Sequence, residues 1–144
     1  MKVLFVCTGN MCRSPAAEKL LRHLGGPKFE SRSRGTAAQA YTNMPGEVIE
    51  FLIQAGVKDL KHTPTLVMEQ DVDWADVVLP MEEYHFDIVA ERFPQSMRKM
   101  HLFLDFCTGS EGKGQRDPMG QGAAVFNQVL GEIKAAIEML VNKK

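Results

Sequence analysis

The sequence predicts an α/β fold: a three-layer sandwich with a four-stranded parallel sheet of order 2-1-3-4 and helices on both faces. Two observations lead to this class. Strand-like and helix-like segments alternate along the whole chain, and the first apolar run, residues 3–7, is continuous, as in a strand buried on both faces. With 144 residues and neither repeats nor a linker, the chain is predicted to be one domain, residues 1–144.

The first half of the chain follows from local signals. After the strand at residues 3–7 and a polar loop, Pro15 is a favoured first-turn residue for a helix, with Ser14 as its expected N-cap. Gly25 ends that helix, and the alternating residues 29–34 predict the second strand. The buried stripe of the helix is a set of leucines, Leu20, Leu21 and Leu24.

A second helix is expected to begin near Pro45 and to end at Gly56. Its apolar face consists of Val48, Phe51, Leu52 and Ala55. The apolar run at residues 76–81 predicts the third strand, and residues 82–92 the helix that follows it. Residues 100–104 form another apolar run, which predicts the fourth strand.

Residues 107–122 are rich in glycine and charge and lack periodicity, which predicts a long loop that is either functional or disordered. The last helix has a core face at spacings of four and three, consisting of Phe126, Leu130, Ile133, Ile137 and Leu140. In a parallel sheet of this kind ligands bind outside the carboxyl ends of the strands, where Cys7 lies.

Composition narrows the class of protein. The hydrophobic content of 44% and the charged content of 24% are ordinary for a globular protein, and the net charge of −1 argues against nucleic-acid or anionic-membrane binding. The apolar run at residues 3–6 is too short for a signal peptide. Three cysteines suit a reducing compartment, so we expect a cytoplasmic protein, monomeric or weakly dimeric. The basic residues of the first quarter are interpreted as solvated: Lys19, Arg22, Lys28, Arg32 and Arg34.

The loop after the first strand carries the strongest chemical signal, a Cys-x5-Arg-Ser motif at Cys7, Arg13 and Ser14. A loop between a strand and a helix N-terminus directs its backbone N–H groups at one point and forms an anion site. The planar guanidinium of Arg13 can bind two oxygens of a tetrahedral anion, and together these groups stabilise a thiolate at Cys7. Ser14 can donate to that sulfur. The predicted phosphate-binding residues are Thr8, Gly9, Asn10, Met11, Cys12 and Ser14, of which Gly9 and Asn10 tolerate unusual backbone angles.

A thiolate beside an anion site predicts phosphoryl transfer through cysteine. Asp117, in the glycine-rich loop and stiffened by Pro118, is a candidate general acid. From the residues alone Asp71, Asp105 and Glu111 remain alternatives to it. Arg116 precedes Asp117 and is expected to favour the ionised aspartate, which slightly opposes its role as an acid.

Residues 7–15 read Cys-x-Gly-Asn-x-Cys-Arg-Ser-Pro, and on this motif the chain resembles the low-molecular-weight protein-tyrosine phosphatase family over its full length. Further matching segments are Ser33-Arg34-Gly35-Thr36, Ala75-Asp76 with Met81, and Asp117-Pro118. The resemblance implies that Cys7 attacks phosphorus to form a phosphocysteine, while Arg13 and the loop amides hold the phosphoryl oxygens. It implies that Asp117 protonates the leaving oxygen and then activates water, and that Asn10 and Ser33 keep the loop in shape. Glu18 is interpreted as a helix residue rather than a catalytic carboxylate.

The expected substrate is a phosphorylated protein or peptide, with no cofactor. Tyrosine-directed members of the family usually have an aromatic residue after Asp-Pro, where this chain has Met119, so Tyr41 is the candidate aromatic wall beside it. The chain also resembles the protein-arginine phosphatase branch at its Cys-Thr-Gly-Asn, Cys107-Thr108-Gly109-Ser110 and Asp117-Pro118-Met119-Gly120 segments. That branch has a small Thr where this chain has Met11, so we favour phosphotyrosine by side-chain volume and keep phosphoarginine as the alternative.

Two further alternatives stay open. A thioredoxin-coupled arsenate reductase needs a relay of cysteines, for which Cys107 alone is poorly suited, and a non-catalytic phosphate-binding module has no need of Arg13 and Asp117. Cys12 is either a packing residue or a resolving cysteine that forms a reversible disulfide with Cys7. No metal site is predicted, because no paired His or Cys spacing completes a zinc set, and His62 and His101 are interpreted as a loop and a strand residue.

Overall fold

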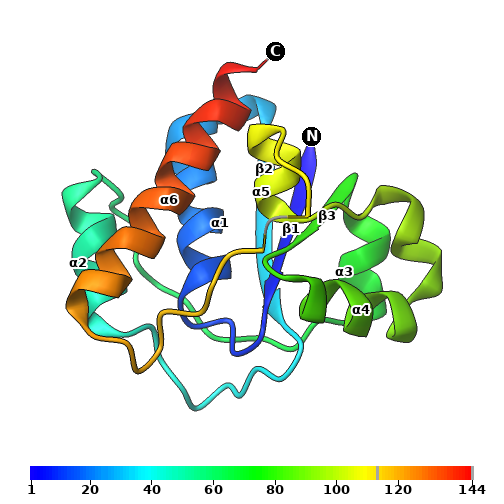
Figure 1. Cartoon of the computed structure of the whole chain (residues 1–144), viewed down its shortest axis with the longest axis horizontal. Coiled ribbons are helices and arrows are strands. Elements are labelled where there is room, and N and C mark those ends of the chain that lie inside the picture. Colours follow the sequence, from blue (N-terminus) through cyan, green and yellow to red (C-terminus); the bar gives the residue numbers. More distant parts are fainter. Residues whose placement is uncertain (113, 144) are drawn as a thin grey trace.

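Strand β1 (Lys2–Cys7) is the centre of a parallel sheet, with β2 (Glu30–Gly35) on one side and β3 (Val77–Pro80) on the other. The computed structural model describes residues 1–112 and 114–143, and in these the sheet has the order β2-β1-β3 between two helical layers (Figure 1). The α-helices are α1 (Arg13–Gly25), α2 (Gly46–Gln54), α3 (Glu69–Trp74), α4 (Glu83–Arg92), α5 (Phe103–Thr108) and α6 (Ala123–Asn142), with 3-10 turns η1 (Gly26–Lys28) and η2 (Pro94–Lys99).

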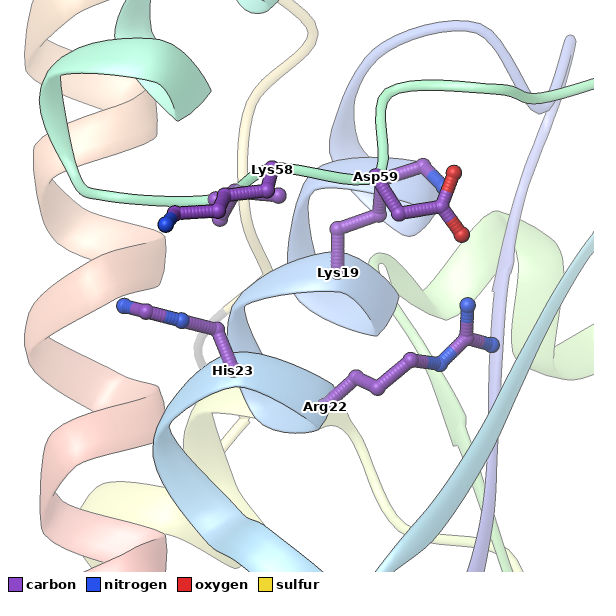
Figure 2. A pocket seen from close by; sticks show the side chains of 6 residues that line it. Lys19, Arg22, His23, Lys58 and Asp59 are labelled. Atoms are coloured by element: carbon purple, nitrogen blue, oxygen red, sulfur yellow. The ribbon is translucent and has the colours of Figure 1, made fainter.

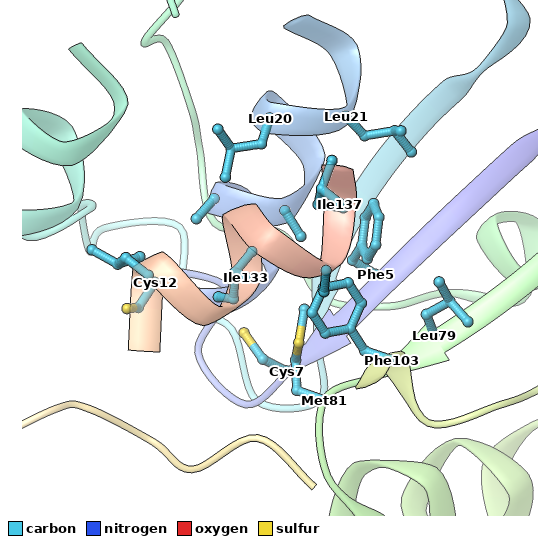
Figure 3. Close-up of a cluster of buried hydrophobic side chains, with 14 of the residues drawn as sticks. Phe5, Cys7, Cys12, Leu20, Leu21, Leu79, Met81, Phe103, Ile133 and Ile137 are labelled. Atoms are coloured by element: carbon cyan, nitrogen blue, oxygen red, sulfur yellow. The ribbon is translucent and has the colours of Figure 1, made fainter. Parts of the chain in front are cut away.

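The central strand is buried on both faces, as its unbroken apolar run predicts. Alternate side chains of a strand point to opposite faces, so Val3 and Phe5 join one core and Leu4 and Val6 the other. The first core lies against α1, α5 and α6, and Phe103 of α5 packs edge-on against Phe5 with ring centroids 5.8 Å apart (Figure 3). The second core lies against α3 and α4 (Figure 1). The predicted α/β class and two-sided helical cover are therefore confirmed.

The predicted fourth strand is wrong, and with it the order 2-1-3-4. Met100 makes a single parallel bridge to Val78, but the chain then turns at Leu102 into helix α5. A short apolar run fits a buried helix as well as a strand. Here residues 103–108 form a helix whose buried side chains join the core on one face of the sheet instead of extending the sheet. The predicted long loop is consequently shorter, because α5 continues through Thr108 and ends at Gly109 with φ 79°.

Helix α1 begins at Arg13, earlier than the predicted start at Pro15, and Cys12 is its N-cap residue. The hydroxyl of Ser14, predicted to cap the helix, instead lies 2.9 Å from the sulfur of Cys7. The remaining predicted helices match α2, α4 and α6 to within a few residues. Helix α3 has no counterpart in the prediction, since its six residues are too short to show a periodic pattern.

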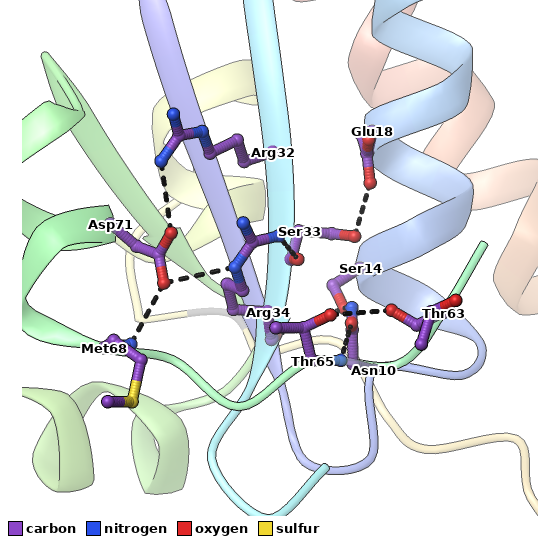
Figure 4. A network of polar contacts seen from close by, with 10 residues as sticks. All are labelled: Asn10, Ser14, Glu18, Arg32, Ser33, Arg34, Thr63, Thr65, Met68 and Asp71. Carbon is purple, nitrogen blue, oxygen red and sulfur yellow. Dashed lines mark hydrogen bonds and ion pairs between the residues drawn. The ribbon is translucent and has the colours of Figure 1, made fainter. Parts of the chain in front are cut away.

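Part of the basic first quarter is not solvated as expected. Lys19 is 3% exposed and donates from Nζ to the carbonyl oxygen of Lys61 at 2.6 Å. Arg32 and Arg34 both pair with buried Asp71 of α3, at 3.2 and 3.1 Å (Figure 4). These contacts fasten β2 to the segment before β3. Among the described residues, no helix has the length and apolar character needed to cross a membrane.

Candidate active site

The loop between β1 and α1 is held against the end of β2. Thr36 and Ala37 donate backbone hydrogen bonds to the carbonyl oxygens of Cys7 and Thr8, each at 2.9 Å. A Cβ at Gly35 would lie 2.5 Å from the carbonyl oxygen of Thr8, so only glycine permits this close approach. The loop therefore leaves the sheet at a fixed position relative to its neighbouring strand.

Asn10 fixes the loop from behind. Of the two residues expected to adopt unusual angles, Asn10 is the one with a positive φ, 56°. It is fully buried: its Nδ2 donates to Ser14 Oγ at 2.8 Å, and its Oδ1 accepts from the backbone N–H of Thr65 at 2.9 Å (Figure 4). His62 donates from Nε2 to the carbonyl oxygen of Asn10 at 2.7 Å, a structural contact that sequence spacing did not reveal.

Cys7 is 3% exposed, and its sulfur has a hydrogen-bond partner already in place. Ser14 Oγ accepts from Asn10 and lies 2.9 Å from Cys7 Sγ, but 3.5 Å from its other possible acceptor, the carbonyl oxygen of Arg34. A sulfur that has lost its proton can only accept, so Ser14 is the donor of this bond when Cys7 is ionised. This arrangement stabilises a thiolate at Cys7.

Arg13 is anchored by two groups that the sequence did not indicate. It is 3% exposed, and its Nη1 donates to Glu82 Oε2 at 2.6 Å and to the carbonyl oxygen of Gln115. Glu82 follows β3, and Gln115 lies in the loop before Asp117. Both come from the carboxyl end of the sheet, where such groups are expected to gather.

A cavity of about 250 Å³ brings most of the predicted site together. It is lined by Cys7, Thr8, Gly9, Met11, Cys12, Arg13, Asp117 and Met119. Asp117 is exposed, and its Oδ1 accepts the backbone N–H of Met119 at 3.0 Å. Arg116 donates to Gln128 Oε1 of α6 at 2.6 Å, which directs its guanidinium at that helix. Tyr41, the candidate aromatic wall, is 79% exposed and does not line the cavity.

Ser33, which the resemblance implies as a support of the loop, and Glu18, interpreted from the sequence as a helix residue, lie outside the cavity. Ser33 is buried, and its hydroxyl donates to Glu18 Oε1 at 2.5 Å (Figure 4). Glu18 thus ties α1 to β2 and also pairs with Arg22 at 2.5 Å. The two residues fix the helix that carries Arg13 and Ser14 against the strand beneath the loop.

The thiols of the other two cysteines, Cys12 and Cys107, have raised pKa values. Burial, and then the neighbouring Cys7, raise the pKa of Cys12 to about 12. Burial likewise raises the pKa of Cys107 to about 12. Both therefore stay protonated at neutral pH. Cys12 lines the same cavity as Cys7, whereas Cys107 lines a separate cavity between α5 and α6.

A smaller cavity of about 140 Å³ lies between α1 and the segment after α2, lined by Lys19, Arg22, His23, Val57, Lys58 and Asp59. Its charged groups do not converge: Arg22 and His23 extend in opposite directions in Figure 2. A backbone hydrogen bond from Lys61, and then the charges of Lys19 and Arg22, lower the pKa of Asp59, so the carboxylate offsets the neighbouring cations. These groups form no anion site like the one at Cys7.

The family model for low molecular weight phosphotyrosine protein phosphatase matches residues 2–144. The chain belongs to this family. It is 32% identical to a protein-arginine-phosphatase of Geobacillus stearothermophilus, over 99% of this chain and 95% of that protein. Among solved structures in this fold family, a low molecular weight protein tyrosine phosphatase from T. tengcongensis superposes with a TM-score of 0.90 at 32% identity, covering 100% of this chain and 99% of that one.

A third relative bears on the chemistry of the family. It is a C7S mutant of the YwlE arginine phosphatase with a phosphorylated active-site serine. Its TM-score is 0.92 at 28% identity, with 99% of this chain and 95% of that chain covered. A phosphoryl group on that side chain is the serine counterpart of a phosphocysteine. The chain is thus similar to relatives of two kinds, protein-tyrosine phosphatases and protein-arginine phosphatases.

Proposed function

We propose that the protein hydrolyses phosphotyrosine in proteins or peptides, with Cys7 as nucleophile, Arg13 as phosphate ligand and Asp117 as general acid and base. The observation that carries this proposal is their meeting in one cavity although Asp117 is 110 positions from Cys7 along the chain. Cys7 supplies the nucleophile, the loop and Arg13 an anion site, and Asp117 a proton donor, which together meet the requirements of phosphoryl transfer through cysteine.

In the first half of the reaction the thiolate of Cys7 attacks phosphorus, so that a sulfur–phosphorus bond forms while the bond from phosphorus to the tyrosyl oxygen breaks. Asp117 transfers its proton to that oxygen. In the second half the Asp117 carboxylate takes a proton from water, which attacks phosphorus and releases inorganic phosphate and the thiolate. The hydrogen bond from Ser14 to the sulfur makes the thiolate a better leaving group in this step.

The choice of phosphotyrosine rests on the apolar thioethers of Met11 and Met119. Both line the cavity that contains Cys7, and Met119 is 40% exposed, so the two side chains can contact a planar ring above the phosphate. A flexible thioether forms an apolar slot without a fixed stacking surface. This arrangement supports an aromatic leaving group over a cationic one.

The substitution Met11→Thr tests this choice. With the smaller, polar threonine the slot loses apolar contact, and we expect the ratio of kcat/KM for a phosphotyrosine peptide over a phosphoarginine peptide to fall roughly tenfold or more. The measurement is phosphate release from two peptides that differ only in the phosphorylated residue. A wild-type enzyme that cleaves only the phosphoarginine peptide would contradict the choice of substrate while leaving the mechanism at Cys7 in place.

Phosphoarginine is the second candidate substrate, supported by the similarity to arginine phosphatases over the whole chain. Its leaving group is a guanidine nitrogen, which requires a proton from the same acid, Asp117. The same peptide comparison separates the two candidates. Arsenate reduction through a cysteine relay finds less support, because Cys107 is fully buried and lines a cavity other than that of Cys7.

We further propose that Cys12 protects Cys7 from irreversible oxidation. Peroxide oxidises the Cys7 thiolate to a sulfenic acid and is itself reduced to water; the Cys12 thiol then displaces water to form a disulfide, which a dithiol reduces. The test uses enough peroxide to carry an unprotected sulfenic acid on to the sulfinic acid, which dithiothreitol does not reduce. Dithiothreitol is then expected to restore most of the activity of the wild type and little of that of Cys12→Ser. Equal recovery in both proteins, measured with p-nitrophenyl phosphate, would show that Cys12 only packs behind the loop.

A further inference from the structure

His85 is a buried histidine at the beginning of α4, 77 positions from Thr8 of the phosphate loop along the chain. Its Nε2 lies 2.7 Å from Thr8 Oγ1, the first side chain after Cys7. Its Nδ1 accepts the backbone N–H of Glu82 at 3.2 Å. The fully buried ring of His85 thus connects the phosphate loop to the N-terminus of α4, which packs on the face of the sheet opposite to α1.

These contacts determine the protonation state of the ring. Because Nδ1 accepts from an N–H group, a neutral His85 carries its proton on Nε2. Burial, and then Arg13, lower the pKa of His85 to about 4, which keeps it neutral in the neutral range. His85 therefore donates to Thr8, and Thr8 Oγ1 is the acceptor of that bond.

Thr8 then has its own hydroxyl proton available as a donor. The residue is half-buried and lines the cavity together with Cys7, Arg13 and Asp117. A hydroxyl whose lone pair is occupied by a buried donor is more polarised and has fewer rotamers open to it. The anion expected in this cavity is the phosphoryl group, which accepts hydrogen bonds strongly.

We propose that His85 is a positioning residue of the phosphate site: through the Nε2–H to Oγ1 bond it fixes the Thr8 side chain, so that the Thr8 hydroxyl donates to the phosphoryl group. This inference rests on the proposed function and adds a side-chain donor to the backbone amides and Arg13. It also gives α4 a role at the site, since Glu82, bonded to His85 through its N–H, holds Arg13 through its carboxylate.

The experiment measures binding of inorganic phosphate to the resting enzyme by isothermal titration calorimetry, which reports on the cavity whether or not the enzyme turns over. Thr8→Val removes the hydroxyl and keeps the branched shape. His85→Asn keeps an acceptor for the Glu82 N–H but is too short to reach Thr8. His23→Asn, at an exposed histidine of α1, is the matched control.

We expect each of Thr8→Val and His85→Asn to weaken phosphate binding roughly tenfold, as for the loss of one hydrogen bond to a charged group. The double variant is expected to bind no more weakly than Thr8→Val, because both changes remove the same interaction. His85→Gln places an amide nitrogen near the position of Nε2 and is expected to recover part of the affinity, which loss of a purely structural histidine would not allow.

Unchanged phosphate affinity in Thr8→Val would overturn the proposal, as would losses in the two single variants that multiply in the double variant. If His85→Asn does not fold, His85→Gln takes its place in the comparison: on the wild-type background it should bind phosphate more tightly than Thr8→Val, and on the Thr8→Val background it should cause no further loss. A failure of the proposed function has a different signature: phosphate would still bind with the expected dependence on Thr8 and His85, but no phosphoester would be hydrolysed.

Discussion

Replacing Cys7 by serine is expected to reduce hydrolysis of p-nitrophenyl phosphate by roughly 10⁴-fold or more, as for loss of a nucleophile in other covalent catalysts. A serine hydroxyl is far less acidic than a thiol, so it needs a general base to become a nucleophile. The hydroxyl of Ser14, 2.9 Å from the sulfur in the wild type, cannot act as that base. Serine is nearly isosteric with cysteine and keeps the hydrogen bond to Ser14. The melting temperature of the variant should therefore stay close to that of the wild type.

The matched control for Cys7→Ser is Cys107→Ala, because Cys107 lines a different cavity and should contribute nothing to turnover. Alkylation gives a second readout. The pKa of Cys12 and that of Cys107 are both raised to about 12, so iodoacetamide at pH 7 should modify Cys7 alone and leave the serine variant unmodified. Substantial turnover by Cys7→Ser, or activity that EDTA removes, would contradict catalysis by this thiolate.

The part of the site that lies within one short segment was predictable from the sequence. The strand, loop and helix of residues 2–25 contain Cys7, Arg13 and Ser14, and their spacing alone predicts that these residues lie close together. In the structure Ser14 lies beside Cys7, and Cys7 and Arg13 line one cavity. The details depend on packing. Ser14 bonds to the sulfur rather than capping the helix, because Asn10, held in place by Thr65, occupies the position behind it.

The groups that support the loop from other elements could not be found in this way. Glu82 and His85 lie at the beginning of helix α4, where other polar residues would give the same sequence pattern. The pattern therefore does not indicate that these two residues support the loop. Only the parallel pairing of β1 with β3, in which Val6 lies opposite Pro80, brings their positions to the loop. The prediction of a fourth strand was wrong for a related reason. A short apolar run does not show whether residues 100–104 extend the sheet or cover it, because that depends on packing, here of Phe103 against Phe5.

The cavity places Asp117 where a general acid can act, and Asp117→Asn is expected to distinguish substrates by their leaving groups. For phenyl phosphate, whose leaving group needs a proton, we expect kcat to fall roughly 10²- to 10³-fold. For p-nitrophenyl phosphate the loss should be much smaller, because its leaving group departs well as an anion. Asparagine retains an oxygen that can accept the Met119 N–H, at 3.0 Å in the wild type, so the loop should keep its conformation.

The control for this substitution is Glu111→Gln, which neutralises another exposed carboxylate of the same loop and should leave both rates nearly unchanged. Equal losses for the two substrates would mean that Asp117 shapes the cavity without transferring a proton, and the acid would then have to come from water or from the substrate itself.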